Sequence, residues 1–168
     1  NKEDIMNLPN KITMGRIILA VLLLILLVFP FNEVGVTFPT YYLFDKIAIN
    51  LKYIIGGVMF IVAAFTDFLD GNIARKRNIV TDFGKIMDAI ADKILVNGVL
   101  IVLAVNGDIS VVVPVVIITR DIVVDSIRMV SSGKGKVIAA SWMGKAKTVC
   151  MLIGISLIFF SNLPFELL

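Results

Sequence analysis

Five apolar segments recur along the chain, and polar residues separate them. They span residues 17–29, 53–65, 94–105, 111–124 and 149–160. A transmembrane helix needs about 20 mostly apolar residues, so neighbouring polar residues must complete each of these shorter segments. Ionisable groups at membrane depth are costly unless they face a bundle interior or a water-filled cavity. The pattern therefore predicts an all-α helix bundle whose polar helix halves converge on one cavity.

Composition places this bundle in a membrane. Of the 168 residues, 58% are hydrophobic and only 17% are charged, whereas soluble domains have about 25% charged residues. We therefore expect one polytopic membrane domain over residues 1–168, with five spans in this chain. The chain has no histidine and a single cysteine, Cys150, which excludes histidine catalysis, histidine metal ligands and an internal disulfide. The net charge of +3 would suggest nucleic acid in a soluble protein, but here we expect no nucleic-acid partner.

Lysine and arginine are unevenly distributed between the two ends of the predicted helices. With a cytoplasmic N-terminus, only Lys46 and Lys52 of the 16 Lys and Arg residues fall on the outer side. Cytoplasmic loops are enriched in these residues, so we expect the polar cavity to open to the cytoplasm. Residues 31–50 are predicted to form an external loop with a short helix from Tyr41. Because five spans leave the C-terminus outside, we expect a sixth span beyond residue 168.

Four aspartates lie in the polar residues that complete the helices predicted around the second and third segments. Asp67 and Asp70 are spaced i, i+3, and Asp88 and Asp92 are spaced i, i+4, so each pair lies on one helix face. The short polar stretch 76–83 makes the two helices antiparallel neighbours, and the pairs can then face one another. Four carboxylates in a site of low dielectric constant need cations. Oxygen ligands without His or Cys suit Mg²⁺ or Mn²⁺, and two such ions would balance the four charges.

The residues beside these aspartates extend the predicted chemistry to a diphosphate. Once two divalent ions balance the four aspartates, the positive charge of Arg75 remains and would favour a bound diphosphate. Mg²⁺ commonly uses carboxylates together with substrate phosphates as ligands. Gly71 and Ala74 present little side chain, so a nucleotide or a neighbouring helix can approach the backbone closely. The alternative is that the aspartates form structural salt bridges with Arg75, Arg77 and Lys85. Four carboxylates at helical spacing on two adjacent membrane helices weigh against that alternative.

The spacing Asp-x2-Asp-Gly-x2-Ala-Arg-x8-Gly-x3-Asp-x3-Asp, from Asp67 to Asp92, resembles the signature of the CDP-alcohol phosphotransferases, and every fixed position is filled. Three further regions resemble the bacterial branch of that family that uses glycerol 3-phosphate. They are residues 7–13 with Arg16, the Arg120-Asp121 pair with Arg128, and the Gly-Lys-x-Lys-Thr element at 144–148. Glutamate is more usual in the family where Asp121 stands. The resemblance implies a six-helix membrane fold in the bacterial cytoplasmic membrane.

The resemblance also implies a reaction and assigns roles by position. These enzymes transfer a phosphatidyl group from CDP-diacylglycerol to an alcohol, release CMP and use divalent metals. Asp67, Asp70 and Asp88 would hold the metals, with Asp92 as a further ligand and the general base. The residues implied to bind CDP-diacylglycerol are Asn10, Gly71, Ala74, Arg75 and Thr81. Thr81 has the alternative of capping the third helix. The implied acceptor is sn-glycerol 3-phosphate, and the product is phosphatidylglycerophosphate.

A phosphorylated acceptor needs a cation site of its own. Four cationic residues near the same membrane face are the candidates, and arginine suits fork-like phosphate contacts: Arg120, Arg128, Lys145 and Lys147. Pairing of the two arginines with Asp121 and Asp125 is the alternative, and both roles can coexist.

Three other functions compete with this interpretation. The first is a related phosphotransferase with inositol phosphate, serine or a second phospholipid as the acceptor. The second is an intramembrane prenyltransferase, although its Asp-rich motifs usually lie on more distant helices. The third is a divalent-cation transporter, which would need an acidic path open to both sides. The family is commonly homodimeric, which makes a homodimer a further expectation, and the residues themselves indicate no dimer face.

Overall fold

The computed structural model describes residues 8–43, 47–77, 82–133 and 142–160. Five α-helices make up most of this described part: α2 (Leu8–Val28), α3 (Leu51–Arg77), α4 (Asp82–Val105), α5 (Val112–Gly133) and α6 (Trp142–Phe159). Between α2 and α3 lie a short 3-10 helix, η1 (Phe31–Val34), and an antiparallel hairpin of β1 (Thr40–Leu43) and β2 (Ile47–Asn50).

The helical prediction is confirmed, since every predicted apolar segment lies largely within one of these helices. Each helix extends beyond its apolar segment into the neighbouring polar residues, as the bilayer argument requires. The predicted short helix from Tyr41 is wrong. Tyr41 lies in β1 and pairs with Ile49 of β2. Tyrosine, threonine and isoleucine favour pleated structure, and the paired strands satisfy the backbone groups of this connection.

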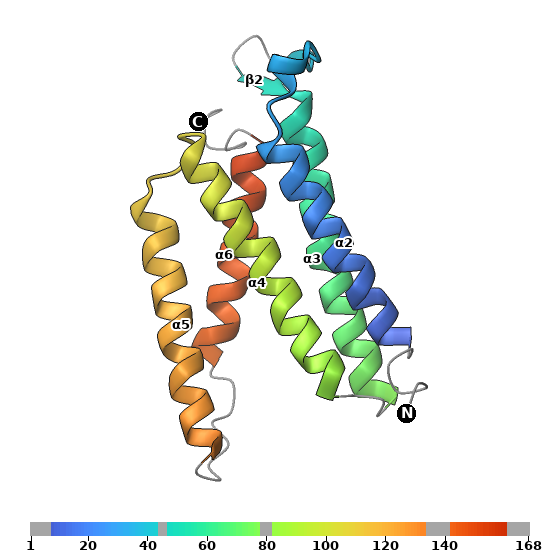
Figure 1. The fold of residues 1–168 in the computed structure, drawn as a ribbon, viewed down its shortest axis with the longest axis vertical. Helices are drawn as coiled ribbons and strands as arrows, with labels where there is room; N and C mark the ends of the chain where they lie inside the picture. The colour runs from blue at the N-terminus through green and yellow to red at the C-terminus, as the bar shows by residue number, and fades with distance from the viewer. Residues whose placement is uncertain (1–7, 44–46, 78–81, 134–141, 161–168) are drawn as a thin grey trace.

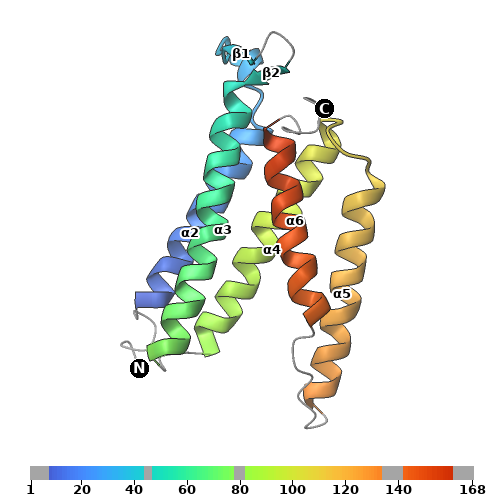
Figure 2. The same cartoon turned by 180° about the vertical axis from the view of Figure 1, so that it is seen from behind.

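The polar ends of the helices all lie toward the same end of the bundle (Figure 1). The start of α2, the end of α3 and the start of α4 lie together there, and α3 and α4 run in opposite directions. The most extensive helix contacts are those of α2 with α3 and with α4, while α5 packs on α4 and α6 on α3. Seen from behind, α6 lies in front of α4 between α3 and α5 (Figure 2). Helix α2 therefore joins the two helices that carry the aspartates.

The core is apolar and comes from four of the helices. Its fully buried residues are Ala20 and Leu23 of α2, Phe60 and Ala63 of α3, Val99 and Leu103 of α4, and Phe159 of α6. Glycine permits the closest helix contacts. A Cβ at Gly57 would lie 2.9 Å from Phe159 Cβ, and one at Gly98 would lie 2.8 Å from the methyl groups of Leu24. Small residues therefore let α3 approach α6 and α4 approach α2.

The end of α4 is closed by a turn at Asn106-Gly107, where the apolar segment stops. Gly107 has φ of +86°, and the Asp108 N–H donates to Leu103 O at 2.9 Å, which is the Schellman pattern of helix termination. Asp108 also accepts a hydrogen bond from the Tyr53 hydroxyl at 2.7 Å. That bond ties the start of α3 to the end of α4, at the end of the bundle opposite the predicted site.

Large apolar side chains cover much of the outer surface. Among the described residues, one helix segment, Lys11–Val28, is long and apolar enough to cross a membrane, and Ala146–Phe159 is a shorter apolar helix. Only 28% of the first segment is buried inside the protein. Apolar side chains that point outward belong to both central and peripheral helices, and include Ile18, Leu22 and Ile25 of α2 and Val116 and Ile122 of α5. These features fit a helical membrane protein, while the number of spans stays a prediction.

Candidate active site

Two of the four aspartates meet a buried arginine from α2. The Arg16 side chain is 1% exposed, and its Nη1 donates to Asp67 Oδ1 of α3. Its Nη2 lies 3.5 Å from Asp88 Oδ1 of α4. The hydroxyl of Thr13, one turn before Arg16, donates to the same Asp88 oxygen at 2.7 Å. A cation and a hydroxyl on one face of α2 therefore hold carboxylates from two other helices.

The partners of Arg16 differ from it in exposure. The side chains of Asp67 and Asp88 are 51% and 43% exposed, so each carboxylate has one side against α2 and another side open. A guanidinium stays protonated in proteins, and a buried charge is costly unless it is paired. The sequence reasoning placed Arg16 only among residues that resemble the family. A charged residue ahead of an apolar helix, one turn after a threonine, was the available signal.

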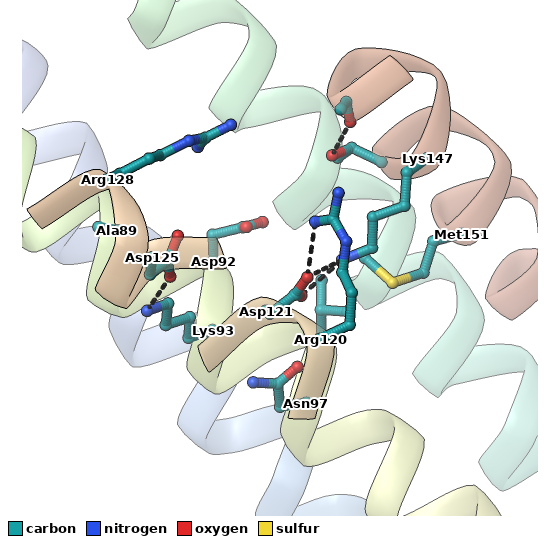
Figure 3. A pocket seen from close by; sticks show the side chains of 13 residues that line it. Ala89, Asp92, Lys93, Asn97, Arg120, Asp121, Asp125, Arg128, Lys147 and Met151 are labelled. Atoms are coloured by element: carbon teal, nitrogen blue, oxygen red, sulfur yellow. Dashed lines mark hydrogen bonds and ion pairs between the residues drawn. The ribbon is translucent and has the colours of Figure 1, made fainter. Parts of the chain in front are cut away.

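The third described aspartate, Asp92, lines a cavity of about 340 Å³ between α4, α5 and α6. Four cationic side chains line the same cavity (Figure 3), namely Lys93, Arg120, Arg128 and Lys147, together with the carboxylates Asp121 and Asp125. Three of the four predicted phosphate-binding residues, Arg120, Arg128 and Lys147, therefore come together from two different helices, α5 and α6. The cations outnumber the carboxylates by one among the described lining residues.

Asp121 is the centre of the charge network in this cavity. Lys147 Nζ contacts both oxygens of its carboxylate, and Arg120 Nη1 donates to Oδ1 at 3.1 Å. The alternative of an Arg120–Asp121 pair is thus confirmed, without removing Arg120 from the cavity. A phosphate that enters must compete with one carboxylate for both of these cations.

The second pair of that alternative, Arg128 with Asp125, is not formed. Asp125 Oδ2 instead lies 2.6 Å from Lys93 Nζ of α4, which links α4 to α5. Arg128 makes no ion pair with a described residue, and no dashed line reaches it in Figure 3. Sequence reasoning missed Lys93 as a member of this cavity and did not predict the contact of Lys147 with Asp121. Arg128 is left as the cation most available to an anion from outside.

The remaining predicted residues are only partly described. Asp70, Gly71, Ala74 and Arg75 belong to α3, Asn10 to α2 and Lys145 to α6, but their side chains lie outside the described part of the structure. Thr81 falls outside the described residues. Among the described residues, no group of three or more His, Cys, Asp or Glu gathers as a metal site. The predicted set of four carboxylate ligands includes Asp70, so this observation leaves that set a prediction.

The fold and the site define a helical protein with a cavity lined by charged side chains and with half-exposed carboxylates near one end of the bundle. A sequence profile of the CDP-alcohol phosphatidyltransferase family matches residues 6–168. The chain belongs to this family and is therefore a transferase of lipid biosynthesis. The family resemblance drawn from the aspartate motif is confirmed.

Individual relatives narrow the comparison. The chain is 41% identical over 165 residues to the CDP-diacylglycerol–glycerol-3-phosphate 3-phosphatidyltransferase of Bacillus subtilis, covering 96% of this chain and 80% of the relative. A protein of the same name from Mycoplasma genitalium is 40% identical over 148 residues, which cover 88% of this chain and 62% of the relative. The Rickettsia bellii protein of that name is 34% identical over 152 residues, covering 90% of this chain and 74% of the relative.

Proposed function

We propose that this chain transfers the phosphatidyl group of CDP-diacylglycerol to sn-glycerol 3-phosphate and forms phosphatidylglycerophosphate and CMP. The observation that carries the proposal is the cavity in which Asp92 shares the walls with Arg120, Arg128 and Lys147. A carboxylate beside several cations suits an acceptor that has both a hydroxyl to deprotonate and a phosphate to hold. The names of the relatives support the same donor and acceptor.

The carboxylates of Asp67 and Asp88 are chemically suited to bind a divalent metal ion. Asp67 and Asp88 already share one cation, the Arg16 guanidinium, so their oxygens are arranged to face positive charge. Carboxylate oxygens are the ligands that Mg²⁺ and Mn²⁺ prefer. We propose that Asp67, Asp70, Asp88 and Asp92 hold two such ions. Bound metal would neutralise the diphosphate and stabilise the charge on the departing CMP.

The chain's own residues divide the rest of the reaction. The phosphate of the acceptor binds Arg128 and the cations around Asp121, and arginine offers it a fork of donors. Asp92 takes the proton from the attacking hydroxyl of glycerol 3-phosphate. The hydroxyl oxygen then bonds to the phosphorus that carries the diacylglycerol group, and the bond from that phosphorus to the CMP oxygen breaks. The proton stays on Asp92 until product leaves.

We further propose a multi-pass protein of the bacterial cytoplasmic membrane with its N-terminus and cavity on the cytoplasmic side. The polar halves of the helices contain the aspartates, Arg120, Arg128 and Lys147. The acidic ends of α3 and α4 lie beside the start of α2 (Figure 1). The positive-inside rule favours a cytoplasmic location for this end. A homodimer in the membrane remains a proposal taken from the family.

The test is CMP release from CDP-diacylglycerol by the purified protein in detergent with Mg²⁺. Glycerol 3-phosphate, inositol phosphate and serine are compared as acceptors, and the lipid product is identified by mass. We expect turnover with glycerol 3-phosphate alone. Turnover with inositol phosphate alone would overturn the acceptor, and no turnover with any acceptor would overturn the proposed reaction.

A further inference from the structure

Arg16 has the features of a component of the site. It is the largest fully buried side chain of the described residues, yet its charge is directed at two half-exposed carboxylates. A buried residue that served packing alone would not need to be a cation, because burial of a charge costs free energy. The position of its charge, between α3 and α4, is therefore the property to explain.

The geometry fixes both carboxylates from the same side. One guanidinium uses Nη1 for Asp67 and Nη2 for Asp88, and its planar fork cannot follow independent movements of the two. Thr13 holds Asp88 from the adjacent turn of α2. The described contacts from α2 reach Oδ1 in both aspartates, and both side chains are about half exposed.

The charge of Arg16 opposes any second cation at these carboxylates. A fixed guanidinium and a divalent ion repel one another, and each lowers the other's favourable interaction with the same oxygens. The guanidinium therefore weakens binding of the divalent ion, and a bound ion weakens the contact of the guanidinium with the carboxylates to the same extent. Arg16 should then do two separable things, which are to hold the carboxylates in place and to weaken ion binding.

We propose that Arg16 is a positioning residue of the metal site, which holds Asp67 and Asp88 by its two Nη atoms and lowers their affinity for divalent ions. The inference rests on the proposed function in its choice of metal ligands. Weaker binding keeps the carboxylates from being committed to ions before the diphosphate of the donor supplies further oxygen ligands. Placement of the carboxylates comes from the fork, and the lower affinity comes from the charge.

Two substitutions separate these effects. Arg16→Gln removes the charge, and Arg16→Lys keeps the charge but loses the two-pronged contact. Mn²⁺ binding to the purified protein without lipid substrate is measured by electron paramagnetic resonance of the free ion. Turnover at saturating Mn²⁺ is measured in the CMP assay. Lys52→Gln, which removes a cation at the opposite end of the bundle, is the matched control for net charge.

We expect Arg16→Gln to bind Mn²⁺ more tightly than wild type, by roughly 5- to 150-fold, the usual range of coupling between linked binding events. Arg16→Lys should retain an affinity near that of wild type and lose at least about tenfold in turnover, because partners that orient ligands typically contribute 10- to 100-fold. Lys52→Gln should leave both quantities unchanged.

Weaker or unchanged Mn²⁺ binding by folded Arg16→Gln would overturn the charge effect, since a merely structural residue gives that result. Wild-type turnover by Arg16→Lys would overturn the positioning role, and this variant decides the matter if Arg16→Gln does not fold. If Arg16→Gln binds Mn²⁺ more tightly than wild type but the wild-type protein transfers no phosphatidyl group, only the proposed function is refuted. A protein that transfers normally without the tightening would refute this inference alone.

Discussion

Arg128→Ala removes from the cavity a cation that makes no ion pair with a described residue. In the proposed reaction this arginine donates to the phosphate of glycerol 3-phosphate. Hydrogen bonds to charged groups contribute about 1.5–3 kcal/mol, and each 1.4 kcal/mol is roughly tenfold in affinity. The KM for glycerol 3-phosphate should therefore rise by roughly 10- to 150-fold, while the KM for CDP-diacylglycerol stays near its wild-type value.

Arg120→Ala is the matched comparison on the same helix. Arg120 already shares Asp121 with Lys147, so phosphate gains less from it than from an arginine without such a partner. The acceptor KM should rise by less than it does in Arg128→Ala. Arg128→Lys keeps the charge without the fork and should fall between wild type and Arg128→Ala.

Initial rates of CMP release, with each substrate varied while the other is saturating, give the two KM values. Detergent and salt are held constant, because surface electrostatic effects weaken with ionic strength. An unchanged acceptor KM in Arg128→Ala would make Arg128 structural. An equal or larger rise in Arg120→Ala would show that pairing with Asp121 does not limit a cation's part in binding.

Three further outcomes follow from the structure. Asp92→Asn should keep CDP-diacylglycerol binding and lose about 10²–10⁴-fold in turnover. The control Asp108→Asn, at the opposite end of the bundle, should keep turnover. Substantial residual activity in Asp92→Asn would remove Asp92 as the base. Gly57→Ala, whose Cβ would meet Phe159 Cβ at 2.9 Å, should lower stability by about 1–3 kcal/mol in thermal unfolding, whereas Gly15→Ala, with open space around it, should not. Chelation of divalent ions should abolish CMP release, and Mg²⁺ or Mn²⁺ should restore it; turnover that persists in excess chelator would exclude the metal role.

The helices were predictable because their signal is local. Apolar residues of one segment lie together in one helix, and the Asn106-Gly107 stop forms the turn that such a pair favours. The connection around Tyr41 was predicted wrongly because a short run of β-favouring residues carries little information by itself. Its strand conformation depends on Ile49 and its neighbours as pairing partners, and that pairing is a tertiary property.

Charge partners were predictable only where they were close in sequence. Arg120 and Asp121 are adjacent and do pair. Asp125, however, pairs with Lys93 of another helix and not with Arg128, its neighbour on the same helix. The bond from Arg16 to Asp67 joins residues 51 positions apart. Helix packing, rather than spacing within a helix, decides such contacts, so a sequence pattern gives the chemistry of a site before it gives its partners.

Spacing alone could not distinguish Asp88 from Asp92, because both lie on one face of α4. Packing separates them. Asp88 is held by Thr13 and is next to Arg16, whereas Asp92 lines the cavity with the cations of α5 and α6. A carboxylate that faces the acceptor's pocket has the access that a base needs, and this difference in surroundings favours Asp92 over Asp88 for that role.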